Sequence, residues 1–152
     1  MTESSPVSPI RLQKLAEFRF QLRKFLRFSE TASDAAGISA QQYQLLQVIL
    51  AIPAGQGATI SYLAERMMLR HNSAVELVDR AVRAGLVTRA SDEEDLRRSL
   101  ISLTEEGRKL MERLIAEHLA EIDRLGPEIQ VALERVLASA ETPVEESEFE
   151  EK

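Results

Sequence analysis

Residues 73–85, SAVELVDRAVRAG, decide the fold of this chain. Their apolar side chains recur at helical spacing and the charged ones share the opposite face, a pattern that predicts a short amphipathic helix. Ser73 followed three residues later by Glu76 is the pattern of a capping box. Gly85 follows the last periodic residue, where a left-handed stop is expected. We therefore expect both ends of this helix to be set locally.

A shorter helix is predicted just upstream, over Thr59–Met68, with Thr59 as its N-cap. Residues 69–72 would join the two helices as a helix-turn-helix. Downstream, two β-rich runs, 86–89 and 99–103, enclose a polar tip. This pattern predicts a hairpin with a long charged loop, a wing.

These motifs resemble, in order and spacing, the MarR family of winged-helix transcription regulators. The matching positions are Leu63-Ala64-Glu65-Arg66, Leu77-Val78-Asp79-Arg80, Gly85-Leu86-Val87, Asp95, Arg97, Leu103-Thr104 and Gly107. The resemblance implies a mainly α fold of the α+β winged helix type, in which N- and C-terminal helices form a dimerisation domain. It also implies a homodimeric, sequence-specific repressor that a small-molecule effector releases from double-stranded DNA.

The rest of the chain extends this plan. After a break at Ala36-Gly37, Ser39-Ala-Gln-Gln42 forms a second predicted capping box. Thr104 is expected to cap a long helix. Gly126-Pro127 should interrupt that helix, and a last helix should follow. The expected organisation is a flexible arm over 1–9, a helical dimerisation region over 10–35 and 105–140, a DNA-binding domain over 36–104 and an acidic disordered tail over 141–152. The first and the last two helices carry more apolar side chains than one small domain can cover, which favours an obligate homodimer.

Composition excludes several classes of protein. The chain has 152 residues, no cysteine and two histidines, so we expect neither disulfides, nor a metal site, nor a cofactor. No apolar run could span a bilayer, and a cytoplasmic protein without a membrane partner is the default expectation. The net charge of −6 arises mainly in residues 114–152, which carry eleven acidic and three basic residues, and so it does not exclude DNA as a partner. No nucleophile or carboxylate constellation points to an enzyme.

The DNA-reading residues follow from placing the second helix in a major groove. Its exposed N-terminal candidates are Arg70, His71, Asn72, Ser73 and Glu76. Asn can pair with adenine, Arg with guanine, and Glu can accept from cytosine, unless Glu76 reaches back to cap Ser73. Thr59, Ser61 and Arg80 are expected to contact phosphates or to brace the fold.

The resemblance implies that a wing arginine enters the minor groove and that a nearby aspartate braces it. Asp95 and Arg97 match these roles, and Arg98 is an alternative to Arg97. Wing residues 92–95 are all acidic, so a solvated charged loop is the other interpretation. A twofold dimer would require a pseudo-palindromic DNA site.

The resemblance further implies a cleft for a small aromatic or lipophilic effector. Candidate lining residues are Phe20, Arg23, Tyr43, Met68 and His118, with core packing or surface exposure as the alternative for each. The acidic wing and tail also leave open a second function, that of a winged-helix dimer which binds protein and not DNA.

Overall fold

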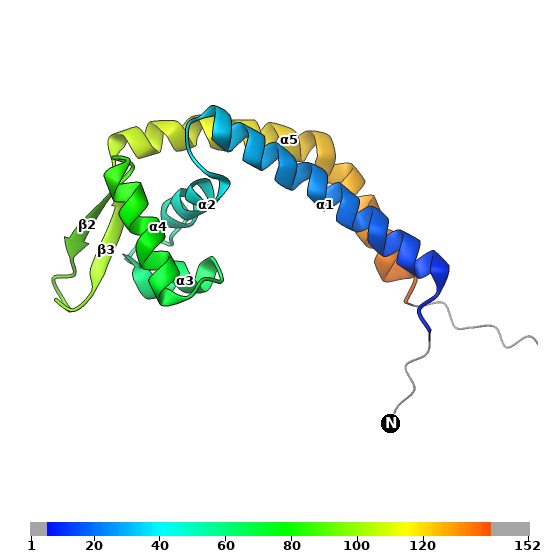
Figure 1. The fold of residues 1–152 in the computed structure, drawn as a ribbon, viewed down its shortest axis with the longest axis horizontal. Coiled ribbons are helices and arrows are strands. Elements are labelled where there is room, and N and C mark those ends of the chain that lie inside the picture. Colours follow the sequence, from blue (N-terminus) through cyan, green and yellow to red (C-terminus); the bar gives the residue numbers. More distant parts are fainter. Residues whose placement is uncertain (1–5, 141–152) are drawn as a thin grey trace, which may run out of the picture. The chain divides into compact units, whose positions relative to one another are not determined.

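The computed structural model describes residues 6–140, which form five helices and a three-stranded sheet (Figure 1). The elements are α1 (Pro9–Ala35), α2 (Ala40–Leu50), β1 (Ala58–Thr59), α3 (Ile60–Arg66), α4 (His71–Arg83), β2 (Val87–Ser91), β3 (Ser99–Leu103) and α5 (Glu105–Ala138). The predicted mainly α winged helix-turn-helix fold is confirmed. The first five residues of the predicted arm and the whole predicted acidic tail, 141–152, lie outside the described residues.

Two compact units divide the chain. Residues 28–120 form one, here called the winged unit, and the described residues 6–27 and 121–140 form the other, here called the two-helix unit. Helices α1 and α5 each contribute residues to both units.

Local sequence signals set most helix ends in the winged unit. Ser39 accepts from the backbone N–H of Gln42, and the Gln42 side chain accepts from the Ser39 N–H, so the predicted capping box is confirmed. Thr59 caps α3 by accepting from the N–H of Tyr62. Gly37, with φ +81°, follows α1 in the left-handed conformation that glycine adopts without strain.

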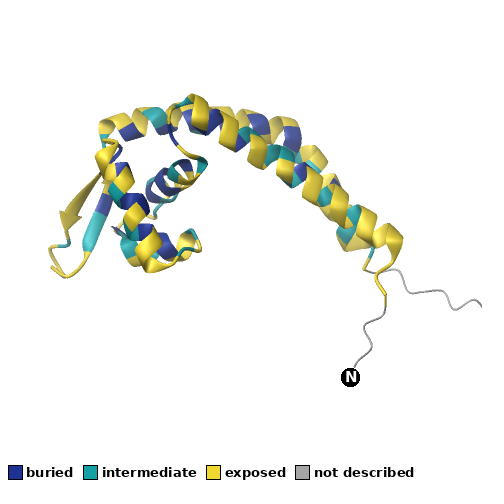
Figure 2. Ribbon diagram, in the orientation of Figure 1, coloured by how far each residue is buried: buried dark blue, intermediate teal, exposed yellow. Residues whose placement is uncertain are grey.

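The core of the winged unit forms where α2, α3, α4 and the sheet meet. Figure 2 shows buried stripes on α2 and α4. The most deeply buried large side chains are Leu45, Leu46, Leu63, Leu77, Val78, Val87, Met111 and Leu114. On α4, burial of Ala74, Leu77, Val78 and Ala81 leaves the opposite face of the helix to solvent.

A junction at Gly85 and Leu86 ties α4, the sheet and α5 together. Gly85 has φ +74°, and the Leu86 N–H donates back to the carbonyl of Ala81 at 3.0 Å. Thr104 donates from its hydroxyl to the Gly85 carbonyl at 2.7 Å and from its N–H to the Leu86 carbonyl at 3.0 Å. The Thr104 hydroxyl also accepts from the N–H of Gly107, as the predicted cap of α5 requires. One short backbone segment therefore orients three elements.

The wing is the antiparallel hairpin of β2 and β3. The sheet order is β1-β3-β2, with Val87 opposite Leu103 and Ser91 opposite Ser99. The short strand β1 pairs with β3 through Ala58 and Thr59. Because Thr59 lies opposite Leu100, this pairing places the start of α3 near the end of β3 that adjoins the wing loop.

The predicted capping box at Ser73 is wrong. Helix α4 begins at His71, with Arg70 at the N-cap position and no side-chain capping bond. The preceding helix, α3, ends in a tight turn. In this turn Met68 has φ +53° and the Leu69 N–H donates to the carbonyl of Ala64. The chain therefore enters α4 earlier than the sequence indicates, and Ser73 lies within the first turn of the helix.

The predicted break at Gly126-Pro127 is also wrong, because α5 is one helix of 34 residues with Pro127 inside it. Proline removes one backbone hydrogen bond and costs about 3 kcal/mol in a helix interior. In the two-helix unit, Leu125 and Ala132 are buried on either side of Pro127, so continuing the helix keeps both contacts.

The two-helix unit pairs the first part of α1 with the last part of α5. Lys24 Nζ lies 3.6 Å from Glu128 Oε2, and Glu17 and Gln21 line a pocket with Ala132 and other α5 residues. Many large apolar side chains of the unit stay exposed, namely Val7, Ile10, Leu12, Leu15, Phe20, Leu26, Ile122, Val131, Leu133 and Leu137. Two helices with this much open apolar surface lack a core of their own.

Residues 6–140 contain neither a membrane-spanning helix nor a metal-binding cluster of side chains. None of their helices combines the length and apolar character that crossing a bilayer requires. No group of three or more His, Asp or Glu side chains in this range is arranged to hold a metal ion.

We predict that Gly107→Ala lowers the free energy of unfolding by about 1–3 kcal/mol, because overpacking forces the backbone to shift. A Cβ at this position would lie 2.3 Å from the carbonyl oxygen of Leu86, which the junction holds in place. Urea unfolding at a fixed protein concentration would measure the change. Gly126→Ala is the control, because its Cβ meets only Ile122 Cγ2 at 3.8 Å; a loss of stability there equal to that of Gly107→Ala would contradict the packing argument.

Candidate nucleic-acid interface

The face of α4 that points away from the core carries the predicted base-reading residues. Arg70, His71, Asn72, Ser73 and Glu76 are all exposed. Because no side chain caps the start of α4, its first N–H groups and the positive end of the helix dipole face outward. The end of α4 that carries these residues is therefore suited to an anionic partner.

A groove of about 300 Å³ lies between α4, the start of α3 and the wing. Its lining residues are Thr59, Ile60, Ser61, His71, Val75, Arg89, Arg97, Arg98 and Ser99. The structure thus brings five predicted residues together, Thr59, Ser61, His71, Arg97 and Arg98. Arg70, Asn72, Ser73, Glu76 and Arg80 do not line this groove. Arg80 donates from Nε to the Glu76 carbonyl at 3.5 Å.

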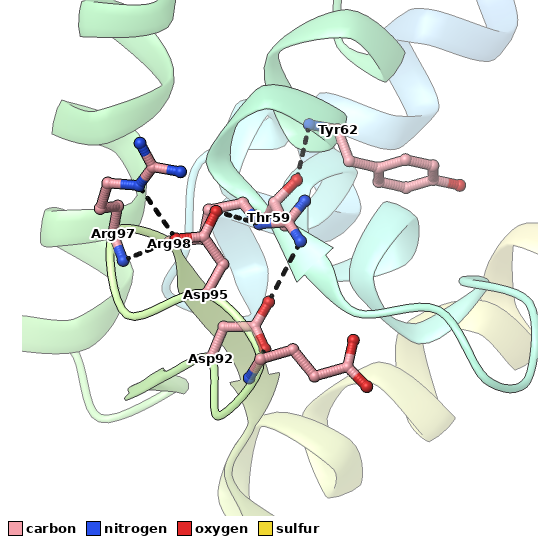
Figure 3. A network of polar contacts seen from close by, with 7 residues as sticks. Thr59, Tyr62, Asp92, Asp95, Arg97 and Arg98 are labelled. Carbon is pink, nitrogen blue, oxygen red and sulfur yellow. Dashed lines mark hydrogen bonds and ion pairs between the residues drawn. The ribbon is translucent and has the colours of Figure 1, made fainter.

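The tip of the wing is held by a network of carboxylates and arginines (Figure 3). The Arg98 N–H donates to the Asp95 carbonyl at 3.0 Å, which closes a four-residue turn. Arg98 also lies 3.4 Å from Asp92 and 3.7 Å from Asp95, through different nitrogens of its guanidinium group. Asp92 in turn accepts from the N–H of Glu94. These bonds order the loop without contacts from outside it.

Arg97 and Arg98 use their guanidinium groups differently. Arg97 donates to Asp95 Oδ1 from its backbone N–H at 3.1 Å and from Nε at 3.2 Å. Its terminal nitrogens remain outward on a side chain that is 91% exposed, whereas the terminal nitrogen Nη2 of Arg98 is paired with Asp92. The bonds from Arg97 hold the pKa of the Asp95 carboxyl below its ordinary value, with a smaller contribution from the charge of Arg98.

The sequence analysis missed an ion pair between α4 and the wing. Arg89 Nη2 on β2 lies 2.9 Å from Asp79 Oδ1 on α4. The signal was present in the strand pattern, since Arg89 lies two residues after buried Val87 and so shares its face of the hairpin. A charged side chain on that face indicates a partner on the adjacent helix.

Two of the candidate effector residues, Tyr43 and His118, pack together in the winged unit. Their rings stack at 4.1 Å, and Phe28 contacts the His118 ring edge-on at 5.3 Å. His118 Nδ1 lies 2.6 Å from the Leu114 carbonyl, which can only accept, and Nε2 lies 2.9 Å from the Ser29 hydroxyl. Both side chains are buried in this cluster.

The other three effector candidates are on the surface. Met68 is 92% exposed, in the turn between α3 and α4. Phe20 and Arg23 are exposed on α1 in the two-helix unit, where the ammonium group of Lys24 lies 4.9 Å from the centre of the Phe20 ring. The structure does not bring Met68 into the Tyr43–His118 cluster.

Comparison with solved structures supports the same fold over most of the chain. AbsC from Streptomyces coelicolor, a MarR family transcriptional regulator, matches with a TM-score of 0.74 at 21% identity, over 90% of this chain and 95% of AbsC. MepR of S. aureus in complex with DNA matches with a TM-score of 0.60 at 23% identity, over 81% of this chain and 97% of MepR. A search of curated protein sequences gave no match.

Sequence similarity identifies the family. CouR from Rhodococcus jostii RHA1, solved with bound p-coumaroyl-CoA, is 31% identical, with a TM-score of 0.59 over 66% of this chain and 69% of CouR. A sequence model of the MarR family matches residues 36–98, which include the helix-turn-helix and most of the wing. The chain therefore belongs to the MarR family of transcriptional regulators, whose members are not enzymes.

Proposed function

We propose that the chain is a homodimeric repressor that binds a pseudo-palindromic site on double-stranded DNA and is released by a small effector. The observation that carries the DNA-binding part is the groove in which α3, α4 and the wing present His71, Arg97 and Arg98 together. The similar structure of MepR in complex with DNA supports the same role here. Because its target is chromosomal DNA, the proposed place of action is the cytoplasm.

In this proposal the start of α4 enters the major groove. Arg70, His71, Asn72, Ser73 and Glu76 would meet base edges there, since the buried stripe of α4 fixes which face is outward. Asn72 is the adenine reader and Arg70 the guanine reader. Glu76 is the acceptor for cytosine, because it takes no part in capping α4. Thr59, Ser61 and Arg80 would contact phosphates.

The wing would place Arg97 in the minor groove. Asp95 braces Arg97 through Nε and the backbone, which leaves the terminal nitrogens for DNA. Arg98 is assigned to holding the loop, since both Asp92 and Asp95 pair with it. Arginine in a narrowed minor groove senses groove width more than base identity.

A second copy of the chain would cover the exposed apolar side chains of the two-helix unit. Ten large apolar side chains among the described residues of that unit are at least 40% exposed, and single soluble chains rarely leave such a patch open. We therefore assign residues 10–35 and 105–140 to dimerisation and 36–104 to DNA binding. The twofold axis would set two α4 helices about 34–36 Å apart on one duplex.

The proposal also includes a class of effector. CouR binds p-coumaroyl-CoA, an aromatic thioester, and a compound of aromatic or lipophilic character is the class we propose here. Such a compound must bind one dimer geometry better than the other to release DNA. Phe20, Arg23, Tyr43, Met68 and His118 stay predictions for its contacts, and the buried Tyr43–His118 pair would have to open to admit it.

Selection from a random duplex pool tests the proposal. We expect the recovered sequences to share an inverted repeat, and footprinting to protect two half-sites about one helical turn apart. Binding should weaken steeply with salt, because phosphate contacts release counterions. A single asymmetric half-site at saturating protein would contradict the dimeric arrangement, and an absence of salt-dependent binding would favour the alternative of a protein-interaction module.

Asn72→Ala and Arg97→Ala should weaken DNA binding in different ways. We expect Asn72→Ala to relax base preference at one position per half-site, at a cost of about 1–3 kcal/mol on the selected duplex and little on random DNA. Arg97→Ala should weaken binding to most sequences and reduce the salt slope. Titrations on the selected and a scrambled duplex measure both effects. Equal losses on the two duplexes for Asn72→Ala would refute its base-reading role.

The pKa of Asp95 reports whether Arg97 is braced. Because this pKa is lowered in the folded wing, the pairing contributes to wing order above the ordinary carboxyl pKa, and the contribution is lost as the pH falls through the lowered value. We expect Arg97→Ala to raise the Asp95 pKa in carboxyl-carbon NMR titrations. Arg98→Ala is the matched control and should raise it less, since its charge is the smaller cause; the reverse order would show that Arg98 holds Asp95.

A further inference from the structure

The tip of the wing carries one large apolar side chain, that of Leu96, between Asp95 and Arg97. Leu96 is 81% exposed. A single exposed leucine is ordinary on a protein surface, so exposure alone assigns it no role. What distinguishes Leu96 is its place in an ordered turn, next to the arginine proposed to enter DNA.

The turn that carries Leu96 also carries Arg97. The hydrogen bond from the Arg98 N–H to the Asp95 carbonyl puts Leu96 and Arg97 at the two central positions of a four-residue turn. Asp95 fixes the Arg97 backbone, and Asp92 and Asp95 fix Arg98. A partner that accepts the Arg97 guanidinium therefore meets the Leu96 side chain at the same time.

We propose that Leu96 contacts DNA, packing against the deoxyribose wall of the minor groove beside Arg97. This inference rests on the proposed function, in which the wing enters that groove. The walls of the minor groove are lined by sugar C–H groups, so an apolar side chain is suited to them, and proteins that enter this groove often carry leucine or methionine. The contact adds affinity by removing apolar surface from water, and it neutralises no phosphate.

Charge complementarity favours a duplex over a protein as the partner of Leu96. The adjacent groove is lined by Arg89, Arg97, Arg98 and His71, and Arg97 offers its terminal nitrogens on a side chain that is 91% exposed. Of the four carboxylates of the wing loop, Asp92 and Asp95 are bound to these arginines or to backbone N–H groups. Glu93 and Glu94 line a different pocket, with Gly55 and Tyr62, to which Arg97 does not belong. The side of the loop that presents Arg97 is therefore the cationic one, and an apolar contact beside it matches a polyanion with apolar sugar edges.

Salt titrations on the duplex recovered by selection test the inference. We expect Leu96→Ala to weaken binding about tenfold at every salt concentration, on the scale of leucine burial, with an unchanged slope of log K against log salt. Arg97→Ala should instead lower the magnitude of the slope, by about one for each wing. Leu96→Met, which keeps an apolar side chain, should retain most of the affinity.

Two further measurements show whether Leu96→Ala disturbs the fold or the turn. The melting temperature of Leu96→Ala should match that of the unchanged protein, and the Asp95 pKa should stay lowered, because the side chain is exposed and the turn is held by other residues. Unchanged DNA affinity in Leu96→Ala would overturn the contact. A changed salt slope with a normalised Asp95 pKa would also overturn it, by showing that Leu96 acts only through the turn. Failure of the unchanged protein to bind any duplex would refute the proposed function itself.

Discussion

The backbone of Gly85 and Leu86 is the constraint on which the arrangement of the winged unit depends. Gly85 is in the left-handed region, Leu86 bonds back to α4, and both carbonyls accept from Thr104 at the start of α5. Gly107 completes the junction, because a side chain there would collide with the Leu86 carbonyl. The direction of α4, the first residue of the hairpin and the origin of α5 are therefore set by one segment. A wing placed in this way lines one groove together with residues of α4.

The two units differ in how far they bury their apolar side chains. The winged unit buries a continuous core between its helices and the sheet, so its outward face can carry polar and charged side chains. The two-helix unit buries Leu125 and Ala132 but exposes a row of larger side chains. This exposed apolar surface is what the proposed homodimer would cover, and under that proposal assembly would be a condition of order in this unit.

Local signals allowed most of the fold to be predicted, and tertiary packing explains where they failed. The caps at Ser39, Thr59 and Thr104 depend on neighbouring residues only, and they are confirmed. Ser73 carries the same signal, yet after the tight turn at Met68 the N-cap position of α4 falls on Arg70, three residues earlier. Pro127 does not end α5, because buried contacts on both sides outweigh one lost hydrogen bond. The Asp79–Arg89 pair joins residues that only the folded hairpin brings together, so the strand pattern indicates a partner for Arg89 but does not identify it as Asp79.

The ion pairs of the wing give its acidic residues a structural role. Residues 92–98 carry four carboxylates and two arginines, which would repel a phosphate backbone at long range. Two of the carboxylates, however, hold the turn and the arginines in place. In the proposed complex with DNA, Arg97 would therefore lose little conformational entropy on binding. The net negative loop would weaken indiscriminate attraction to DNA, since that attraction depends on net charge. Under the proposed function, affinity would then require the contacts of α4 and the turn together, and a chain with a net charge of −6 would discriminate among duplexes in this way.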